Sequence, residues 1–126
     1  MNEKKYYICN HCGNIVDFVC GSGAPVRCCG QNMVRLVPGA QEASLEKHVP
    51  YAEVENGKVF VQIGEAAHPM SAEHHIVWIS LVTDKGEHRR NLTPDNAPAA
   101  VFLLHEEKPL AVYAYCNLHG LWKKEL

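Results

Sequence analysis

The sequence predicts an all-β fold in which a small metal-stabilised domain precedes a β-sandwich. Three observations support this expectation. Five of the six cysteines lie within residues 1–37, short β-branched and aromatic segments follow one another along the rest of the chain, and no window keeps an apolar period of 3.6 residues with helix caps. Long helices are therefore not expected.

The first expected domain, residues 1–37, combines its cysteines with the short strand-like runs YYIC, NIVDFVC, PVRCC and MVRLV. A segment of this length cannot bury enough apolar surface to be stable alone, so a bound metal ion is expected to hold it together. The stretch VPGAQEAS, residues 37–44, contains the breakers Pro38 and Gly39 and is expected to be a linker at the start of the second domain, residues 38–126.

The second expected domain is a succession of short strands from His48 onward. Turn signals such as ENG and DKGEH separate runs of β-branched and aromatic residues. Several strands at this spacing indicate a β-sandwich of immunoglobulin-like type. The runs are KVFVQIG (58–64), HIVWISLVT (75–83), RRNLT after the DKGEH turn, AVFLLH (100–105), LAVYAYC (110–116) and the closing LWKKEL.

Composition and charge exclude several classes of function. The 126 residues are 47% hydrophobic and 21% charged, which suits a folded core, and a formal charge of −2 with a pI near 6.4 gives no basic surface for nucleic acid. No apolar run approaches the roughly 20 residues that span a bilayer, and no basic amphipathic stretch suits a membrane surface. The start MNEKKYYIC lacks the features of a signal peptide, so a cytoplasmic protein is expected.

In a reducing cytoplasm, cysteines are more often metal ligands than disulfide partners. The motif CNHC and a later pair of adjacent cysteines supply four thiolates, which is the set that a tetrahedral zinc or iron ion takes. Gly13 allows the turn that aims backbone amides at the sulfurs. The expected ligands are Cys9, Cys12, Cys28 and Cys29.

The adjacent cysteines are the unusual half of this site. Cys28 and Cys29 would point in opposite directions in an extended chain, so the backbone must bend there and distort the tetrahedron, with Gly30 giving the freedom to do so. A vicinal disulfide between them is the alternative. Cys20 is left as a free thiol, and His11 is expected to face solvent.

A second cluster lies outside the first domain. The pair Cys116 and His119, taken alone, favours a buried cysteine beside a surface histidine over a metal site. His68 precedes Pro69, which restricts it to an extended backbone that can hold an imidazole in place. Five nitrogen and sulfur ligands exceed what structural zinc takes and indicate a square-pyramidal, reactive transition-metal centre with one open position. The five candidates are His48, His68, His74, Cys116 and His119.

The motifs CNHCGN…CCG, EKHVP, HPM, EHHIVWI and YCNLHG, in this order, resemble the desulfoferrodoxin family, the two-iron class of superoxide reductases, over essentially the whole chain. The resemblance implies a desulforedoxin-like or rubredoxin-like first domain with iron on the four thiolates. It also implies an immunoglobulin-like catalytic domain in which four imidazoles bind iron in a plane and Cys116 binds on the axis. The spacing to the following tryptophan selects His74, and His75 is expected to line the pocket.

The resemblance implies that the chain reduces superoxide to hydrogen peroxide without releasing oxygen. The thiolate of Cys116 would push electron density onto iron. Lys47 would attract the anion, and Glu46 would take the sixth position in the ferric resting state. If residues 46–48 are extended, Glu46 and His48 share one face and Lys47 points away.

A rubredoxin-like electron donor and a homodimer are further implications of the resemblance. Two other classes of protein compete with the enzyme. One is a non-catalytic iron-binding electron carrier with a closed second site, and the other is a zinc-ribbon interaction protein. Cys20 and His75 depart from the pattern of the family without disturbing the ligand set.

Overall fold

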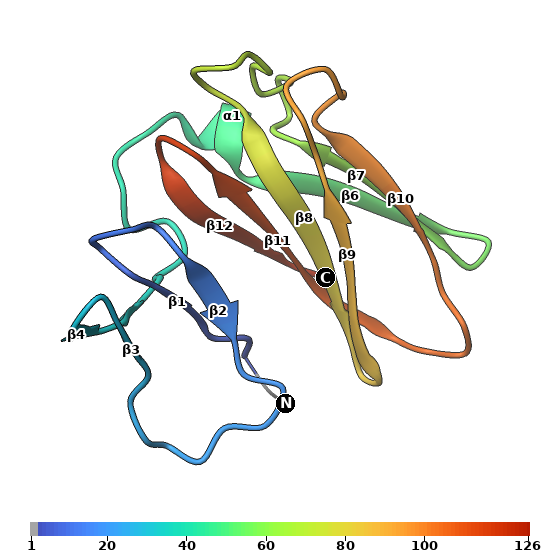
Figure 1. Ribbon diagram of the computed structural model, residues 1–126. Helices are drawn as coiled ribbons and strands as arrows, with labels where there is room; N and C mark the ends of the chain where they lie inside the picture. Colours follow the sequence, from blue (N-terminus) through green and yellow to red (C-terminus); the bar gives the residue numbers. More distant parts are fainter. Residues whose placement is uncertain (1–2) are drawn as a thin grey trace. The chain divides into compact units, whose positions relative to one another are not determined.

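The computed structural model describes residues 3–126, and the chain divides into two compact units, Met1–Val37 and Pro38–Leu126. Nearly all regular structure is β-strand, which confirms the expected fold class (Figure 1). The one helix among residues 3–126 is the single turn α1 (Leu45–His48).

The first unit is built from short antiparallel pairings. β1 (Tyr6–Ile8) lies between β2 (Ile15–Asp17) and β5 (Val34–Arg35), and β3 (Arg27–Cys28) pairs with β4 (Gln31–Asn32) as a separate hairpin. Strands of two or three residues give few ladder hydrogen bonds and little buried surface, so cross-linking by a metal ion is the physical expectation here.

The second unit is a sandwich of two antiparallel sheets. One sheet has the order β10-β7-β6, and the other has the order β12-β11-β8-β9. Consecutive strands form hairpins within a sheet, and the chain crosses between the sheets after β7, β9 and β10. The strands are β6 (Pro50–Glu55), β7 (Lys58–Ile63), β8 (Ile76–Thr83), β9 (Gly86–Asn91), β10 (Ala99–Leu103), β11 (Pro109–Cys116) and β12 (Gly120–Glu125).

The core of the sandwich follows from the alternation along its strands. In β7, residues 59, 61 and 63 are buried and residues 58, 60 and 62 are exposed, as expected for a strand with one face toward the core. β8 and β11 are buried along almost their whole length because they are the central strands of the larger sheet. Cys116 belongs to this core and is completely buried.

Strand β6 is not predicted from its sequence. Its sequence PYAEVE begins with proline and carries two glutamates, which are depleted in strands, and most of its side chains are exposed. β6 is an edge strand that pairs only with β7, a position that tolerates such a composition. Its place is fixed by pairing with β7 and not by its own pattern.

Strand register brings the candidate ligands of the second unit to one end of the sandwich. Pro50 at the start of β6 faces Ile63 at the end of β7, and Cys116 at the end of β11 faces both Ile76 at the start of β8 and Gly120 at the start of β12. α1, the loop before β8 and the β11–β12 turn therefore meet at the same end, as Figure 1 shows.

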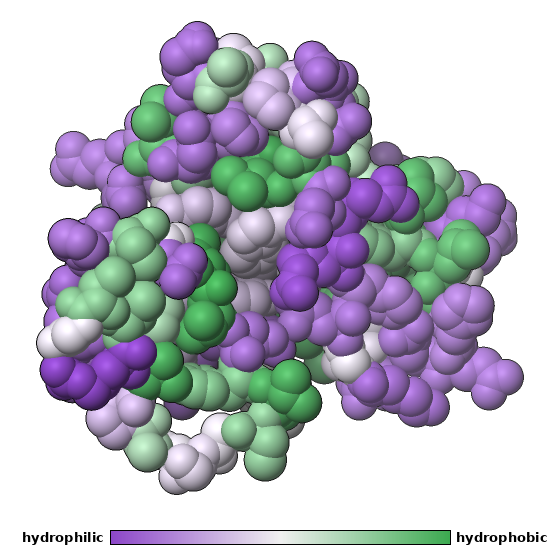
Figure 2. Space-filling model, in the orientation of Figure 1, coloured by the Kyte–Doolittle hydropathy of each residue, from purple (hydrophilic) through white to green (hydrophobic). Residues whose placement is uncertain are grey.

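The surface is mixed in character. On the face shown in Figure 2, hydrophilic residues predominate and hydrophobic residues form separate patches between them. Across the described residues, no helix has the length and apolar character needed to cross a membrane.

Candidate metal centres

The first unit gathers four cysteine sulfurs at one point. The Sγ atoms of Cys9, Cys12, Cys28 and Cys29 all lie within 4.8 Å of one another. Cys12 and Cys28 are 3.6 Å apart at sulfur, and Cys28 and Cys29 are 3.9 Å apart. Four sulfurs at about 2.3 Å from a tetrahedral metal lie about 3.8 Å from each other, so these separations suit an ion at the centre. The sulfurs of Cys28 and Cys29 are too far apart for a disulfide, which would place them about 2.05 Å apart.

The backbone bends as the adjacent cysteines require. Cys29 has a φ of 53° and Gly30 a φ of 77°, so two consecutive residues adopt the left-handed region and turn both sulfurs inward. At the other half of the site, Gly13 has a φ of 84° and its amide donates to the carbonyl of Cys9 at 2.8 Å. The amide of Cys12 lies 3.5 Å from the Cys9 sulfur.

The four thiols differ in acidity. Backbone amide donors, first that of Cys12, lower the pKa of Cys9 to about 6, whereas the hydrogen bond with Cys12 is the main cause that raises the pKa of Cys29 to about 12. Crowded sulfurs cannot all ionise unless a cation compensates their charge. This chemistry fits a metal ion of charge two or more.

The second unit places its candidate ligands on α1, on the loop between β7 and β8, and on the end of β11 with the turn that follows it. His48 ends α1, His68 and His74 lie in the loop between β7 and β8, Cys116 ends β11, and His119 lies in the turn before β12. His48, His68 and Cys116 are buried, with exposures of 3%, 2% and 0%. Ligand atoms of His48, His68, His74 and Cys116 all lie within 4.8 Å of one another.

The four imidazoles form a ring. Neighbouring ring centroids are 4.6 Å apart for His48–His68 and His68–His74, 5.1 Å for His74–His119 and 4.9 Å for His48–His119, and each pair is nearly perpendicular. Across the ring, the centroids of His48 and His74 are 6.1 Å apart. Four short sides with a longer diagonal describe an approximate square.

Hydrogen bonds show which nitrogen of two rings faces inward. Nδ1 of His48 donates to the carbonyl of Ser44 and Nδ1 of His68 donates to the carbonyl of Pro69, both at 2.7 Å. A neutral imidazole with a protonated Nδ1 keeps a lone pair on Nε2. The two Nε2 atoms lie 3.2 Å apart, so two lone pairs face each other.

A shared cation explains this contact. Nitrogens bound side by side at about 2.1 Å from one metal lie about 3.0 Å apart, close to the 3.2 Å between His48 and His68 and the 3.1 Å between Nε2 of His48 and Nδ1 of His119. Nε2 of His74 is buried and has no hydrogen-bond partner. An unpartnered nitrogen beside this ring suits a metal ligand.

The thiol of Cys116 completes the set. Its sulfur lies 3.9 Å from Nδ1 of His119, and burial raises its pKa although the backbone amides of Leu118 and His119 act in the opposite direction. A buried thiolate needs a cation beside it. The donor set of four imidazoles and one sulfur therefore fits a transition-metal ion such as iron.

Burial keeps three of the imidazoles in their metal-binding form. Loss of hydration lowers the pKa of His48 and of His74, and it lowers the pKa of His68 to about 4. The positive charge of Lys47 contributes to the lowering at both His48 and His74. Neutral imidazoles are ready to bind metal near pH 7 without first losing a proton.

Two of the remaining expectations concern residues beside the ring. The structure brings His74 into the ring, since His74 and not His75 belongs to the group of ligand atoms and packs edge-on against His68 and His119. The Nδ1 of His75 donates to the carbonyl of Ser71 at 3.0 Å. The assumption that residues 46–48 are extended is wrong, because they form the helical turn α1. Successive side chains are then rotated by about 100°, and Glu46 and His48 no longer share a face.

The groups that hold the ligands in place could not be predicted from the sequence. The carbonyls of Ser44 and Pro69 orient two imidazoles, and backbone atoms carry no residue-type signal. Gly64 and Asn117 also lie in the loops that carry the ligands. A glycine after a strand and an asparagine beside a ligand cysteine were visible in the sequence, but only the fold shows which distant backbone they contact.

The fold and the two sites define an all-β metalloprotein with two unlike centres. One centre has four thiolates, and the other has imidazoles with a thiolate. Comparison with known proteins then gives the family. A family model described as desulfoferrodoxin matches residues 40–125, and a desulfoferrodoxin of Syntrophotalea carbinolica is 43% identical over 126 residues, covering 99% of each chain. The chain belongs to the desulfoferrodoxin family, and its two ligand groups match the two iron sites of that family.

Solved structures show the same fold. The crystal structure of the superoxide reductase from Treponema pallidum matches with a TM-score of 0.82 at 33% identity, over 98% of this chain and 100% of that chain. A superoxide reductase of the 1Fe type from Giardia intestinalis matches with a TM-score of 0.56 at 32% identity, over 64% of this chain and 99% of that chain.

Proposed function

We propose that the chain is a superoxide reductase whose reaction takes place at the second centre. The observation that carries this proposal is the ring of four imidazoles with the buried sulfur of Cys116 at 3.9 Å from His119. Its similarity to proteins named superoxide reductases supports the same reaction.

The proposed ligands of the second iron are His48, His68, His74, His119 and Cys116. Iron bound there supplies the one electron that, with two protons, converts superoxide to hydrogen peroxide. Carbonyl acceptors orient the imidazoles of His48 and His68. The amides of Leu118 and His119 stabilise negative charge on the sulfur of Cys116.

Lys47 and Glu46 are the proposed catalytic side chains. Lys47 is exposed, and its charge lowers the pKa of two imidazoles of the ring, so its ammonium group lies within electrostatic range of the site. A cation in this position attracts an anionic substrate and stabilises the negative charge of its product. Glu46 is exposed on the same turn and would serve as a ligand in the oxidised state.

We propose that residues 1–37 form a desulforedoxin-like domain with iron on four thiolates and that residues 38–126 form the catalytic domain. The similarity to the Giardia protein supports this division. Nearly all of that protein matches 64% of this chain, which is more than residues 1–37 could supply and less than the whole chain, as expected for a protein that has the second unit alone. The first centre would then store or relay an electron.

The wider setting of the reaction is also proposed. A rubredoxin-like protein would supply electrons, and two copies of the chain would form a homodimer, as the family resemblance implies. A cytoplasmic location is supported by the six cysteines, none of which is joined in a disulfide.

The test is anaerobic reconstitution with ferrous iron followed by sub-stoichiometric superoxide. We expect hydrogen peroxide without oxygen and a new thiolate-to-iron absorption band, and we expect Cys116→Ser to abolish that band. A reduced protein that consumes superoxide no faster than free ferrous ion would instead support the iron-binding electron carrier.

A further inference from the structure

Asn117 links two segments that carry ligands. It lies between Cys116 and Leu118, directly after β11. Its side-chain Oδ1 accepts from the amide of His75 at 2.8 Å, and its Nδ2 donates to the carbonyl of Glu73 at 3.0 Å. Its own amide donates to the carbonyl of His75 at 3.1 Å. Three hydrogen bonds from one residue thus reach both neighbours of His74.

These contacts extend the sheet beyond its last backbone pair. The β8–β11 ladder ends where Cys116 pairs with Ile76, with an irregularity at Tyr115 and Cys116, and the chain then turns away toward His119. A carboxamide carries the same donor and acceptor as a peptide group. The side chain of Asn117 therefore takes the place of the next peptide along β11 and pairs with the loop before β8.

We propose that Asn117 is a positioning residue that fixes His74 against the Cys116–His119 turn, so that this half of the second centre is assembled before metal binds. Other contacts also support the loop, and those of Ser71 hold His74 from within it. The Ser71 amide and hydroxyl donate to the carbonyl of His74 at 2.9 and 3.2 Å, and the His74 amide donates to the hydroxyl at 3.2 Å. Ser71 shapes the loop itself, whereas Asn117 ties it to β11.

Both ends of the carboxamide are needed. Asn117→Ala removes the acceptor for His75 and the donor to Glu73. Asn117→Asp keeps the size and the acceptor but places a carboxylate oxygen against the carbonyl of Glu73, so two acceptors face each other. A negative charge near the centre would by itself strengthen cation binding. Weaker metal binding in Asn117→Asp would therefore indicate lost positioning, and tighter binding would indicate simple electrostatics.

This inference rests on the ligand assignment under the proposed function, and cobalt(II) binding tests the two separately. The full chain is titrated with cobalt(II) while the absorption of cobalt–thiolate bonds is recorded, and Cys116→Ser identifies the part of the signal that belongs to the second centre. If the wild-type signal contains no part that depends on Cys116, the ligand assignment is refuted. A Cys116-dependent signal would support it and make the test of Asn117 possible.

We expect Asn117→Ala and Asn117→Asp each to lower cobalt(II) affinity at the second centre by about tenfold or more and to shift the Cys116-dependent band, as loss of groups that orient ligands does elsewhere. The first centre in the same chain should bind as before. Asn96→Ala is the matched control, since its side chain also accepts a backbone amide, that of Thr93 at 2.7 Å, in a loop after β9. Affinity within twofold of wild type in both Asn117 variants, or tighter binding in Asn117→Asp, would overturn the proposal.

Hydrogen exchange of the metal-free wild-type protein provides a test that does not depend on whether the variants fold. If the segments are joined before metal binds, the amide of His75 should exchange about a hundredfold more slowly than in an unstructured chain. Exchange near the unstructured rate would show that the loop is free without metal and would refute preassembly.

Discussion

Lys47 is exposed on α1, and at the scale of single residues it is the cation whose charge reaches the ring of imidazoles. Superoxide is an anion, so a nearby cation raises the rate at which it reaches the site, and salt screens this attraction. We expect Lys47→Ala to lower the rate of superoxide capture up to about tenfold at low ionic strength and less at high salt. Stopped-flow or pulse-radiolysis kinetics would measure it.

Lys58 provides the matched control for this prediction. It is also an exposed lysine, but it begins β7, at the opposite end of that strand from Ile63 and the ligand loops. Lys58→Ala should leave the capture rate unchanged. An equal loss of rate in both variants would indicate an effect of net charge and would contradict a specific role for Lys47.

Gly64 acts at the residue scale through the side chain that it lacks. Its φ is +84°, and a Cβ at this position would lie 2.4 Å from the carbonyl oxygen of Ala66 and 2.5 Å from that of Lys47. Gly64 also donates to the carbonyl of Val49 at 3.1 Å. The glycine therefore lets the loop toward His68 approach the turn that carries His48.

We expect Gly64→Ala to displace that turn and weaken metal binding at the second centre, with the first centre unaffected. Gly57→Ala is the control, because Gly57 has a φ of +73° with nothing within 4 Å of an added Cβ. Both variants incur the backbone strain of about 1 kcal/mol, but only Gly64→Ala adds a clash. Iron content and thermal unfolding of the two variants would be compared, and equal behaviour would refute the packing argument.

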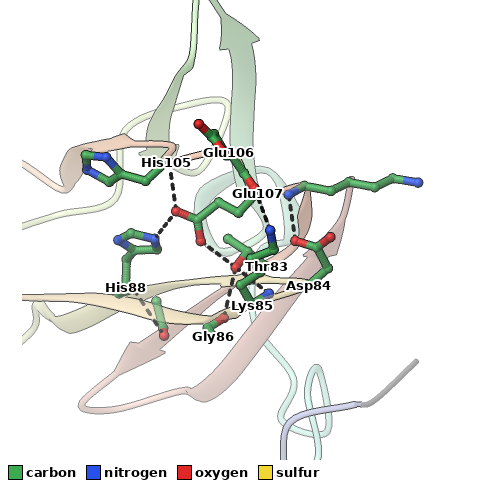
Figure 3. A network of polar contacts seen from close by, with 10 residues as sticks. Thr83, Asp84, Lys85, Gly86, His88, His105, Glu106 and Glu107 are labelled. Carbon is green, nitrogen blue, oxygen red and sulfur yellow. Dashed lines mark hydrogen bonds and ion pairs between the residues drawn. The ribbon is translucent and has the colours of Figure 1, made fainter.

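At the scale of elements, a carboxylate network joins three segments of the sandwich far from the ligand loops (Figure 3). Glu107 accepts from the hydroxyl of Thr83 at the end of β8 at 2.6 Å, from the backbone amide of His105 at 3.0 Å and from Nε2 of His88 in β9 at 2.9 Å. The hydroxyl of Thr83 and the other donors lower the pKa of Glu107 to about 2. The ionised carboxylate therefore stabilises the folded state.

The sign of the pH effect follows from this pKa. The folded-state pKa is below the ordinary value of 4.5, so the stabilisation is fully present above about 4.5 and is lost as the pH falls toward about 2. We expect Glu107→Gln to lower the melting temperature by several degrees at pH 7 and to flatten its fall between pH 5 and pH 3. Glu106→Gln is the control, since the carboxylate of Glu106 points away from the network in Figure 3. Parallel melting curves for wild type and Glu107→Gln would contradict the prediction.

Elements with a strong internal pattern could be predicted from the sequence, and elements fixed by distant partners could not. β7 alternates buried and exposed residues, so KVFVQIG indicated a strand without reference to anything else. β6 lacks that pattern, and the four residues of α1 are too short to show a helical period. Likewise, residue type indicated the cysteines and histidines as candidate ligands. The roles of Asn117 and Gly64 depend on the backbone of distant segments, which only the fold brings near them.

At the scale of the whole molecule, the two ligand sets are separate along the chain. The four sulfurs of the first centre come from residues 9–29, and the second group comes from residues 48–116, with His119 beside it. Each unit can therefore hold its metal with its own residues. This separation predicts that the centres can be removed one at a time.

Cys12→Ser tests this independence. Loss of one thiolate should remove iron from the first centre and lower the iron content from two per chain to one, whereas a pre-reduced second centre should still convert its first equivalent of superoxide to peroxide at the wild-type rate. Cys20→Ser is the matched control, because Cys20 is an exposed free thiol outside the group of four and its loss should leave both irons. If Cys12→Ser stopped the first turnover while the second iron remained bound, the first centre would be part of the reaction. The proposed division into an electron-relaying domain and a self-sufficient catalytic domain would then be wrong.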